Sequence, residues 1–565
     1  MKLAFAAVLL MALNTEMSGS PISNSSEDKV SATDPVRVEQ GLLAGTSGKT
    51  PSIRVYRGIP YAAPPVGDLR WRAPQPPAAW QGVRDATKFG PTCWQTPYPP
   101  AAAIFQNEIS SLSEDCLHLN VWTPAKAATD RLPVMVWIHG GAWSRGASTT
   151  PSYDGENFAK KGVVLVSINY RLGVLGFLAH PELSAESEHH SSGNYGLLDA
   201  VAALRWVKKN IAAFGGDPNR VTIFGESAGS WSVSGLMASP LAKGLFDRAI
   251  GESGGLFGLL QTKEKAEKEG ERIAALLAQT AGGTIPALGP QTSPASGSAA
   301  SSSAVPVQPT GKDLIKALRA KSAEELIKGN PENIRANADG WFLPQDIFTT
   351  YSQGKQNDVP LLVGSNADEG SIFTPPPGTL TTELFVGGVR QRFGAMADQF
   401  LKIYPAGSDD EIRASFAASL RDQTFGWEMR TWARMQLKTG HHAVYRYYFS
   451  RRPPGRQSAR LRAFHAAEIP YVFGNFEWPF PWEDADHKLS ETMSSYWVNF
   501  AATGNPNGKG LPEWPAFDPG KDNSFELGDK IAVREQINKA GLDFYDAYFQ
   551  SRVQAAAAPV TGSGK

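Results

Sequence analysis

Short runs of apolar, often β-branched residues recur along the chain, and small or polar residues such as glycine, serine and asparagine follow them. Runs of this kind predict buried strands, here at residues 134–138, 163–168, 221–224, 360–363 and 444–448. Between them lie segments such as 197–211, whose apolar positions recur every three or four residues, as on an amphipathic helix. This alternation predicts an α/β fold with a large, mostly parallel central sheet and helices on both faces. Active sites of such sheets form on loops at the carboxyl ends of strands.

One internal segment interrupts the pattern. Residues 281–310 consist largely of Ala, Ser, Gly, Pro and Gln, with almost no charge and no periodicity, which predicts a flexible insertion. Strand-like and helix-like runs resume after it, so we expect one domain over residues 35–550. The composition of residues 21–34 and 551–565 predicts a disordered segment at each end of the chain.

The first residues have the composition of an export signal. Met1 and Lys2 precede an apolar run from residue 3 to residue 13, and small and polar residues follow it. This order predicts a secretory signal peptide within residues 1–20. The run is shorter than the ~20 residues that span a bilayer, so no stable membrane anchor is expected. The protein is therefore expected to be secreted or periplasmic.

Cys93 and Cys116 are the only two cysteines, and export would expose them to an oxidising compartment. In an oxidising compartment they are expected to form one disulfide; the alternative is two buried free thiols. Two cysteines without a nearby histidine cluster cannot complete a tetrahedral zinc site, so no metal is expected.

Composition and charge exclude several classes of protein. Hydrophobic residues make up 42% of the 565 residues, which is enough for a large core and excludes wholesale disorder. Basic and acidic residues number 55 each, so the formal net charge is zero. A neutral chain lacks the basic excess that attracts nucleic acid, and no nucleic-acid partner is expected. The composition does not indicate an oligomeric state.

The motif with the clearest chemistry follows the strand predicted at 221–224. It reads G-E-S-A-G at 225–229, and a helix-like segment at 231–237 comes next. A serine in a tight strand-to-helix turn stands exposed above the sheet, and glycines are needed because larger side chains would collide there. The following helix directs its N-terminus at the serine and favours negative charge. Ser227 is therefore the candidate nucleophile.

A second loop, H-G-G-A-W at 139–143, follows the strand predicted at 134–138. Acyl transfer requires backbone N–H groups directed at the oxyanion of the tetrahedral intermediate. Gly141, Ala142 and Ala228 can supply three. A Gly-Gly pair alone is commonly an ordinary turn, but its position before the serine turn is the order expected of an α/β-hydrolase.

The general base is chosen partly by elimination. The order serine, acid, histidine leaves four histidines after Ser227, namely His441, His442, His465 and His487. The first two directly precede a predicted strand and indicate a turn, and His487 lies among charged residues. His465 has small apolar neighbours and is the best candidate. For the acid, the strand ending at 363 delivers both Asp368 and Glu369 to its carboxyl end, and the residues alone do not choose between them.

Together these motifs resemble the type-B carboxylesterase family, which includes the cholinesterases and the bacterial para-nitrobenzyl esterases. The resemblance extends from about residue 38 to about residue 548. Beside the two motifs above it rests on further blocks in the same order: R-G-I-P-Y-A at 57–62, S-E-D-C-L-H-L-N at 113–120, N-Y-R-L-G at 169–173, G-N-Y-G-L-L-D at 193–199, F-G-G-D-P at 214–218 and F-H-A-A-E-I-P-Y-V-F-G at 464–474.

The resemblance implies a Ser227–His465–Glu369 triad and an oxyanion hole made by Gly141, Ala142 and Ala228. It also pairs Cys93 with Cys116. Two further assignments have alternatives that stay open. Ser253 matches a second serine that hydrogen-bonds near the triad, or it is a strand-end serine that satisfies backbone. Glu226 stands beside the nucleophile, or it is surface charge at the turn.

The expected activity is hydrolysis of small to medium, apolar or aromatic carboxylic esters through an acyl-enzyme, with a small-molecule ester as the partner and without a cofactor. Two other functions are weighed against it. A catalytically inactive adhesion module is disfavoured because the serine, acid, histidine and oxyanion-hole residues are all present. A serine peptidase or amidase would need the same residues, so only matched ester and amide substrates separate it from an esterase.

Overall fold

The computed structural model describes residues 34–98, 104–105, 111–258, 260–279, 310–329 and 334–557, with side chains up to residue 552. The predicted signal peptide at 1–20 and nearly all of the segment at 21–34 lie outside the described residues. So do residues 281–309 of the predicted insertion and the end of the chain from 558.

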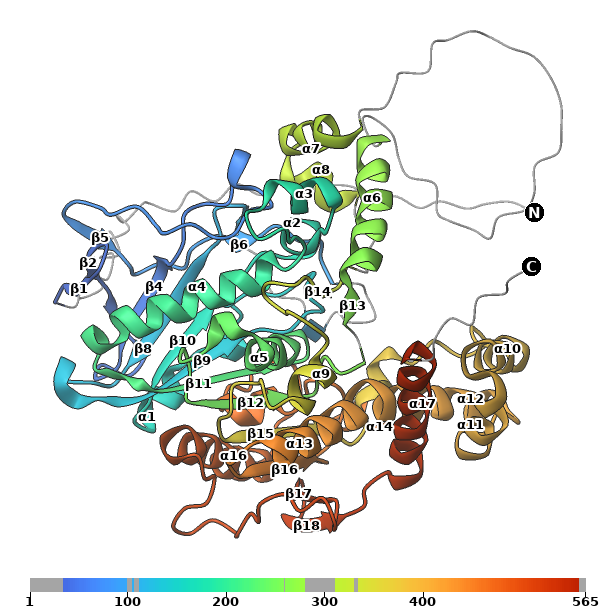
Figure 1. The fold of residues 1–565 in the computed structure, drawn as a ribbon. Coiled ribbons are helices and arrows are strands. Elements are labelled where there is room, and N and C mark those ends of the chain that lie inside the picture. Colours follow the sequence, from blue (N-terminus) through green and yellow to red (C-terminus); the bar gives the residue numbers. More distant parts are fainter. Residues whose placement is uncertain are drawn as a thin grey trace, which may run out of the picture. The chain divides into compact units, whose positions relative to one another are not determined.

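An eleven-stranded sheet forms the centre of the described chain (Figure 1). In spatial order, neighbouring strands are parallel from β10 to β17, and antiparallel strands complete both edges. In spatial order the strands are β18 (Ala532–Glu535), β17 (Asn523–Leu527), β16 (Val444–Phe449), β15 (Leu361–Asn366), β12 (Arg248–Glu252), β11 (Gly216–Glu226), β9 (Leu132–Ile138), β10 (Val164–Ile168), β8 (His118–Thr123), β4 (Arg54–Pro60) and β3 (Thr46–Ser47).

Smaller sheets lie outside the central one. A three-stranded sheet consists of β1 (Val36–Val38), β2 (Gly41–Ala44) and β5 (Val83–Asp85). Two pairs of short strands are β6 (Thr92–Cys93) with β7 (Leu112–Ser113), and β13 (Gln261–Thr262) with β14 (Asn337–Ala338).

The central strands are buried on both faces because successive side chains point to opposite sides of the sheet. In β9, Val134, Val136 and Ile138 enter one apolar core, whereas Met135 and Trp137 enter the other. The first core contains α4 (Tyr195–Asn210), α5 (Ala228–Ala238) and α13 (Trp427–Thr439), and the second contains α1 (Glu156–Lys160), α15 (Ile469–Phe473) and α16 (Asp484–Thr503). Figure 1 shows α4 and α5 lying across the strands.

The remaining helices lie in the connections. Two of them, α6 and α7, flank the predicted insertion and pack against each other. The remaining helices are α2 (Gly173–Phe177), α3 (Pro181–Glu186), α6 (Lys263–Gln279), α7 (Gly311–Ala320), α8 (Ala323–Lys328), α9 (Ile347–Ser352), α10 (Thr382–Phe393), α11 (Ala397–Ile403), α12 (Asp409–Leu420), α14 (Ser458–Leu461) and α17 (Lys539–Ala557).

The predicted α/β fold is confirmed, and the five predicted strands correspond to β9, β10, β11, β15 and β16. One boundary differs from the sequence-based expectation. Helix α17 continues to residue 557, beyond residue 550, where we expected ordered structure to end. Its buried residues Leu542, Phe544 and Tyr545 pack in the core, and the helix extends past them.

The predicted disulfide is present between Cys93, at the end of β6, and Cys116, just before β8. Both cysteines are buried. The bond ties the loop that precedes β8 to the edge of the domain and removes the alternative of two free thiols.

We expect that replacing both cysteines by serine lowers the free energy of unfolding by about 2–4 kcal/mol, because the unfolded chain loses a covalent constraint. Denaturant unfolding of wild type and variant measures the change. Reductant should lower the midpoint of wild type and leave that of the variant unchanged. The prediction would be contradicted if reductant left the unfolding midpoint of wild type unchanged.

Candidate active site

Ser227 occupies the turn between β11 and α5, the position at which the sequence places the nucleophile. Its backbone has φ 55° and ψ −121°, a conformation that side chains rarely adopt. The turn is held on both sides: the N–H of Ser227 donates to the carbonyl of Glu252 at 2.9 Å, and its own carbonyl accepts from Trp231 at 2.9 Å. The strained turn is thus fixed by the neighbouring strand and by the first turn of α5.

Two glycines in the motifs are required by close backbone approach. A Cβ on Gly229 would lie 1.9 Å from the carbonyl oxygen of Ile138, at the end of β9. A Cβ on Gly140 would lie 2.8 Å from the carbonyl oxygen of Glu226 and 3.1 Å from the Cβ of Ser227. The loop after β9 and the serine turn therefore touch through backbone atoms, which brings their N–H groups to one place.

The predicted oxyanion loop has a left-handed backbone, with φ 104° at Gly141 and 55° at Ala142. The N–H groups of these residues and of Ala228 have no acceptor among the described residues. Trp143 anchors the loop: its indole N–H donates to Ser232 at 2.9 Å, and its ring stacks on Phe177. Three fixed and unpaired donors near a serine are suited to holding a developing negative charge.

His465 and Glu369 are in direct contact. The Nδ1 of His465 lies 2.6 Å from Oε2 of Glu369, and Oε1 of the same carboxyl accepts the N–H of Asn366 at 2.7 Å. Glu369 is fully buried and His465 nearly so. The carboxyl is therefore oriented by the end of β15 and in turn fixes the imidazole.

Asp368, the alternative acid, faces away from the imidazole. Its carboxylate accepts from the guanidinium of Arg462 at 3.2 Å and from the N–H of Ala463 at 3.3 Å. Its own N–H donates to the carbonyl of Ala463. Asp368 thus joins the end of β15 to the segment that carries His465.

The other imidazole nitrogen, Nε2 of His465, lies 3.1 Å from Oε1 of Glu226. Within the described residues, no hydrogen bond joins it to the hydroxyl of Ser227. The rings of Phe425 and Phe373 flank the imidazole, with centroids 4.5 and 5.4 Å away. Phe425 belongs to a π-helical turn between α12 and α13, a distortion that is common at functional sites.

Three buried glutamates surround this constellation. Glu226 and Glu252 are paired residues of the adjacent parallel strands β11 and β12, and Glu468 lies three residues after His465. Burial raises the pKa of Glu252 to about 8. Burial first, and the neighbouring carboxyls second, also raise the pKa of Glu226 and Glu468. The three groups therefore favour their neutral, proton-bearing form near neutral pH.

Ser253 joins this group at the end of β12, since its hydroxyl lies 3.5 Å from Oε1 of Glu468. Its N–H donates to the carbonyl of Gly364 at 2.8 Å, so it also satisfies backbone. The other oxygen of Glu468 accepts from the side chain of Asn366. Both sequence-based interpretations of Ser253 therefore describe contacts that it makes. Glu226 is buried, so it is not surface charge.

Among the aromatic residues Trp231, Phe257, Trp341, Phe342 and Phe425, two contact residues of the proposed triad. Phe425 packs on His465, and Trp231 lies one helical turn after Ser227. The other three lie elsewhere: Phe257 packs on Phe348 and Tyr351, Phe342 is buried core, and Trp341 stacks on His189.

Sequence reasoning missed Glu252, Asn366, Phe373 and Glu468 as parts of the site. The available signal was a charged or amide side chain at the end of an apolar strand, or within the small apolar segment after His465. Within the described part of the chain, no three His, Cys, Asp or Glu side chains gather in a way that could hold a metal ion.

Comparisons with known proteins indicate the family to which the chain belongs. A model described as "Carboxylesterase family" matches residues 32–545. The chain is 37% identical to the fumonisin B1 esterase of Sphingopyxis macrogoltabida, over 86% of this chain and 85% of that protein. It is 36% identical to the para-nitrobenzyl esterase of Bacillus subtilis, over 88% and 95%. A solved PNB esterase superposes with a TM-score of 0.75 at 32% identity, and a carboxylesterase of Geobacillus stearothermophilus with 0.75 at 33%; each covers 90% of this chain and 99% of its own.

The buried acids generate a prediction about stability. A carboxyl with a higher pKa in the folded than in the unfolded state stabilises the fold fully below the unfolded value of ~4.3, and the contribution is lost as the pH rises towards about 8. Glutamine cannot ionise. The free energy of unfolding of Glu252→Gln, taken relative to that of wild type, should therefore increase as the pH rises from 5 to 8, by at most ~4 kcal/mol. Thermal unfolding at both pH values measures this. The exposed control Glu513→Gln should show no such trend, and an equal difference at both pH values for Glu252→Gln would contradict the prediction.

Proposed function

The chain belongs to the carboxylesterase family and is a carboxylic ester hydrolase, and from this premise we propose that Ser227 is its nucleophile, His465 the general base and Glu369 the orienting acid. The observation that carries the proposal is the 2.6 Å contact between Nδ1 of His465 and the buried carboxyl of Glu369. This contact lies beside a serine with a positive φ, at the carboxyl ends of parallel strands. Such ends are where sheets of this class carry active sites.

In the proposed first step, His465 removes the proton of Ser227 as the serine oxygen attacks the ester carbonyl. The donation of Nδ1–H to Glu369 would fix the tautomer that leaves Nε2 free to accept that proton. The carbonyl oxygen becomes negative in the tetrahedral intermediate, and the N–H groups of Gly141, Ala142 and Ala228 would stabilise it. His465 then protonates the departing alcohol, which leaves an acyl group on Ser227.

In the proposed second step, His465 activates a water molecule that attacks the acyl-enzyme and releases the acid. For both steps the hydroxyl of Ser227 must reach Nε2 of His465, which lies next to Glu226 at 3.1 Å. Because burial favours the neutral form of Glu226, its carboxyl can donate a hydrogen bond to Nε2 in the free enzyme. We propose that substrate binding replaces this contact by the one with Ser227; catalytic hydrogen bonds often tighten only in the complex.

The proposed substrates are small to medium esters with apolar or aromatic groups. The support is local: Phe373 and Phe425 flank the imidazole of His465, so the space next to the reacting atoms has aromatic walls. The same residues could act on amides, and a nitrophenyl ester compared with the matched anilide separates the two activities.

We further propose that the protein is exported, as the signal-like residues 1–20 indicate. The bond between Cys93 and Cys116 supports this, because disulfides persist in oxidising compartments. Within the described residues, no helix is both long and apolar enough to cross a membrane.

Ser227→Ala is expected to lower kcat for a nitrophenyl ester by ~10³-fold to ~10⁶-fold, because the nucleophile and the base act as one unit. Steady-state kinetics of the purified variant measures the loss. A fluorophosphonate should label Ser227 and no other serine in wild type, and it should label nothing in the variant. Turnover within tenfold of wild type would reject Ser227 as the nucleophile.

Glu369→Gln and Asp368→Asn test the acid as a matched pair of adjacent, isosteric changes. Glu369→Gln keeps the shape but favours the wrong tautomer of His465, so kcat should fall by ~10³-fold to ~10⁴-fold. Asp368→Asn should cost far less, since Asp368 contacts Arg462 and Ala463 instead of the imidazole. The measurement is kcat of both variants above the unperturbed histidine pKa of ~6.5. The reverse order of effects would show that the acid is misassigned.

A further inference from the structure

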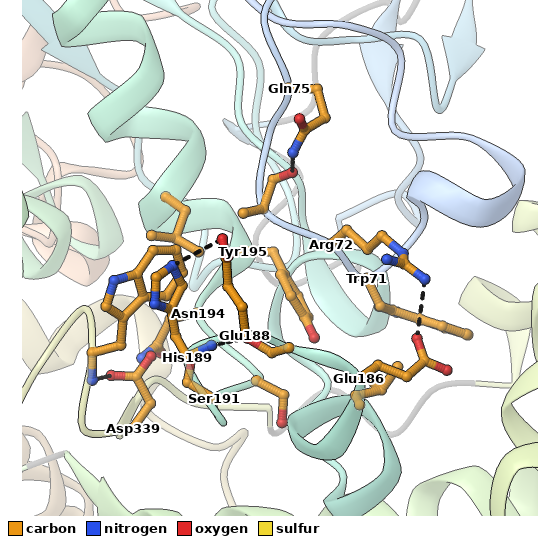
Figure 2. A pocket seen from close by; sticks show the side chains of 16 residues that line it. Trp71, Arg72, Gln75, Glu186, Glu188, His189, Ser191, Asn194, Tyr195 and Asp339 are labelled. Atoms are coloured by element: carbon orange, nitrogen blue, oxygen red, sulfur yellow. Dashed lines mark hydrogen bonds and ion pairs between the residues drawn. The ribbon is translucent and has the colours of Figure 1, made fainter.

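A second hollow lies in a part of the molecule that the proposed reaction does not use (Figure 2). Its volume is about 310 Å³, within the range of small-ligand sites. Three segments form it: residues 71–75, the connection between α3 and α4 with the start of α4, and the loop after β14. No residue that lines it belongs to the triad or to the oxyanion loop.

Hydrogen bonds between these segments hold the walls together. Asn194 and Asn337 bond reciprocally: the N–H of Asn337 donates to the side-chain oxygen of Asn194 at 3.1 Å, and the amide of Asn194 donates to the carbonyl of Asn337 at 2.9 Å. The indole N–H of Trp71 donates to the carbonyl of Val174 at 2.8 Å. The hollow is therefore formed before any ligand arrives, which lowers the entropic cost of binding.

One end of the hollow carries a guanidinium with free donors. The guanidinium of Arg319 donates hydrogen bonds to both carboxylate oxygens of Glu186, at 3.0 and 2.8 Å. Arg72 also forms an ion pair with Glu186, at 3.6 Å, but its side chain makes no hydrogen bond among the described residues. Its side chain is 47% exposed. Two arginines and one glutamate leave a net positive charge at this end.

The other end is aromatic. The imidazole of His189 stacks on the indole of Trp341, with ring centroids 3.8 Å apart and planes 19° apart. Trp71, Tyr195 and buried leucines supply the apolar lining between the two ends. Figure 2 shows Arg72 and Glu186 on one side of the hollow and His189 on the other.

Two further acids border the aromatic end, and each already contacts neighbouring groups. Asp339 is buried, and one of its oxygens accepts the N–H groups of Trp341 and Leu343 at 3.1 and 2.9 Å. Glu188 is 87% exposed and lies 3.4 Å from His189. The strongest unsatisfied donor group of the hollow is thus that of Arg72.

We propose that this hollow is a binding site for a small aromatic carboxylate, whose carboxylate pairs with Arg72 and whose ring packs against Trp341 and His189. A guanidinium presents parallel N–H groups that match the two oxygens of a carboxylate. Compounds of this class include the acids that hydrolysis of aromatic esters releases. The site would let the protein bind such an acid away from Ser227, and this inference does not depend on the assignment of the triad.

The test uses 2-naphthoate as the probe and isothermal titration calorimetry on the full chain. Arg72→Ala should weaken binding by at least tenfold, because the carboxylate loses its partner. Arg72→Lys should weaken it less, since the charge remains and only the paired N–H geometry is lost. Arg205→Ala removes an exposed arginine of α4 that does not line the hollow, and it should bind like wild type.

The design separates this site from the active site, because all variants retain the same triad and any binding there is common to them. Thermal unfolding of each variant confirms that it is folded. A charge-reversed probe with the same ring, 2-naphthylmethylammonium, should bind at least tenfold more weakly than 2-naphthoate. Equal affinity of wild type and Arg72→Ala, no detectable binding, or tighter binding of the ammonium probe would each overturn the proposal.

Discussion

The contact between the turn after β11 and the end of β9 is the constraint on which the site depends. Gly229 lies so close to the carbonyl of Ile138 that no side chain fits between them. This contact aligns the loop that follows β9 with the N-terminus of α5, and so brings that loop next to the turn at Ser227. The positive φ of Ser227 costs roughly 1–3 kcal/mol, and the hydrogen bond to Glu252 together with the surrounding packing holds it.

The electrostatics of the site follow from burial. Glu226, Glu252 and Glu468 are nearly or fully removed from water, and among the described residues no lysine or arginine forms an ion pair with them. Neutral carboxyls can donate hydrogen bonds, which ionised ones cannot. Burial therefore favours the neutral form of these three acids near His465.

The sequence was sufficient for the strands and the tight turn at Ser227, because each rests on a strong local pattern, whereas His465 was chosen partly by elimination. Buried strands are apolar runs, and the turn needs small residues at fixed positions. It was insufficient for Asp368 against Glu369, since both follow the same strand, and the family resemblance had to make that choice. In the structure, Glu369 contacts His465, whereas Asp368 bonds to Arg462 and Ala463. Glu252 and Glu468 were missed because a carboxylate beside apolar residues gives no sign of its burial until the strands are paired.

The positions of the aromatic residues near the active site could not be predicted from the sequence either. No pattern in the sequence around Trp341 indicates that it stacks on His189, at a hollow away from the triad. Phe373 was not considered, although it lies beside His465. Loops decide such positions, and the register of a loop is set by tertiary contacts that no periodic pattern records.

The packing of α6 against α7 has a consequence for how this chain can change length. These two helices border residues 280–309 in the sequence, and they contact each other. Closing a loop twice as long costs only about 0.6 kcal/mol more. Insertions and deletions between α6 and α7 should therefore change the free energy of unfolding of the domain very little. Related chains can therefore differ in length between α6 and α7. A second domain can also be inserted there without disturbing the central sheet.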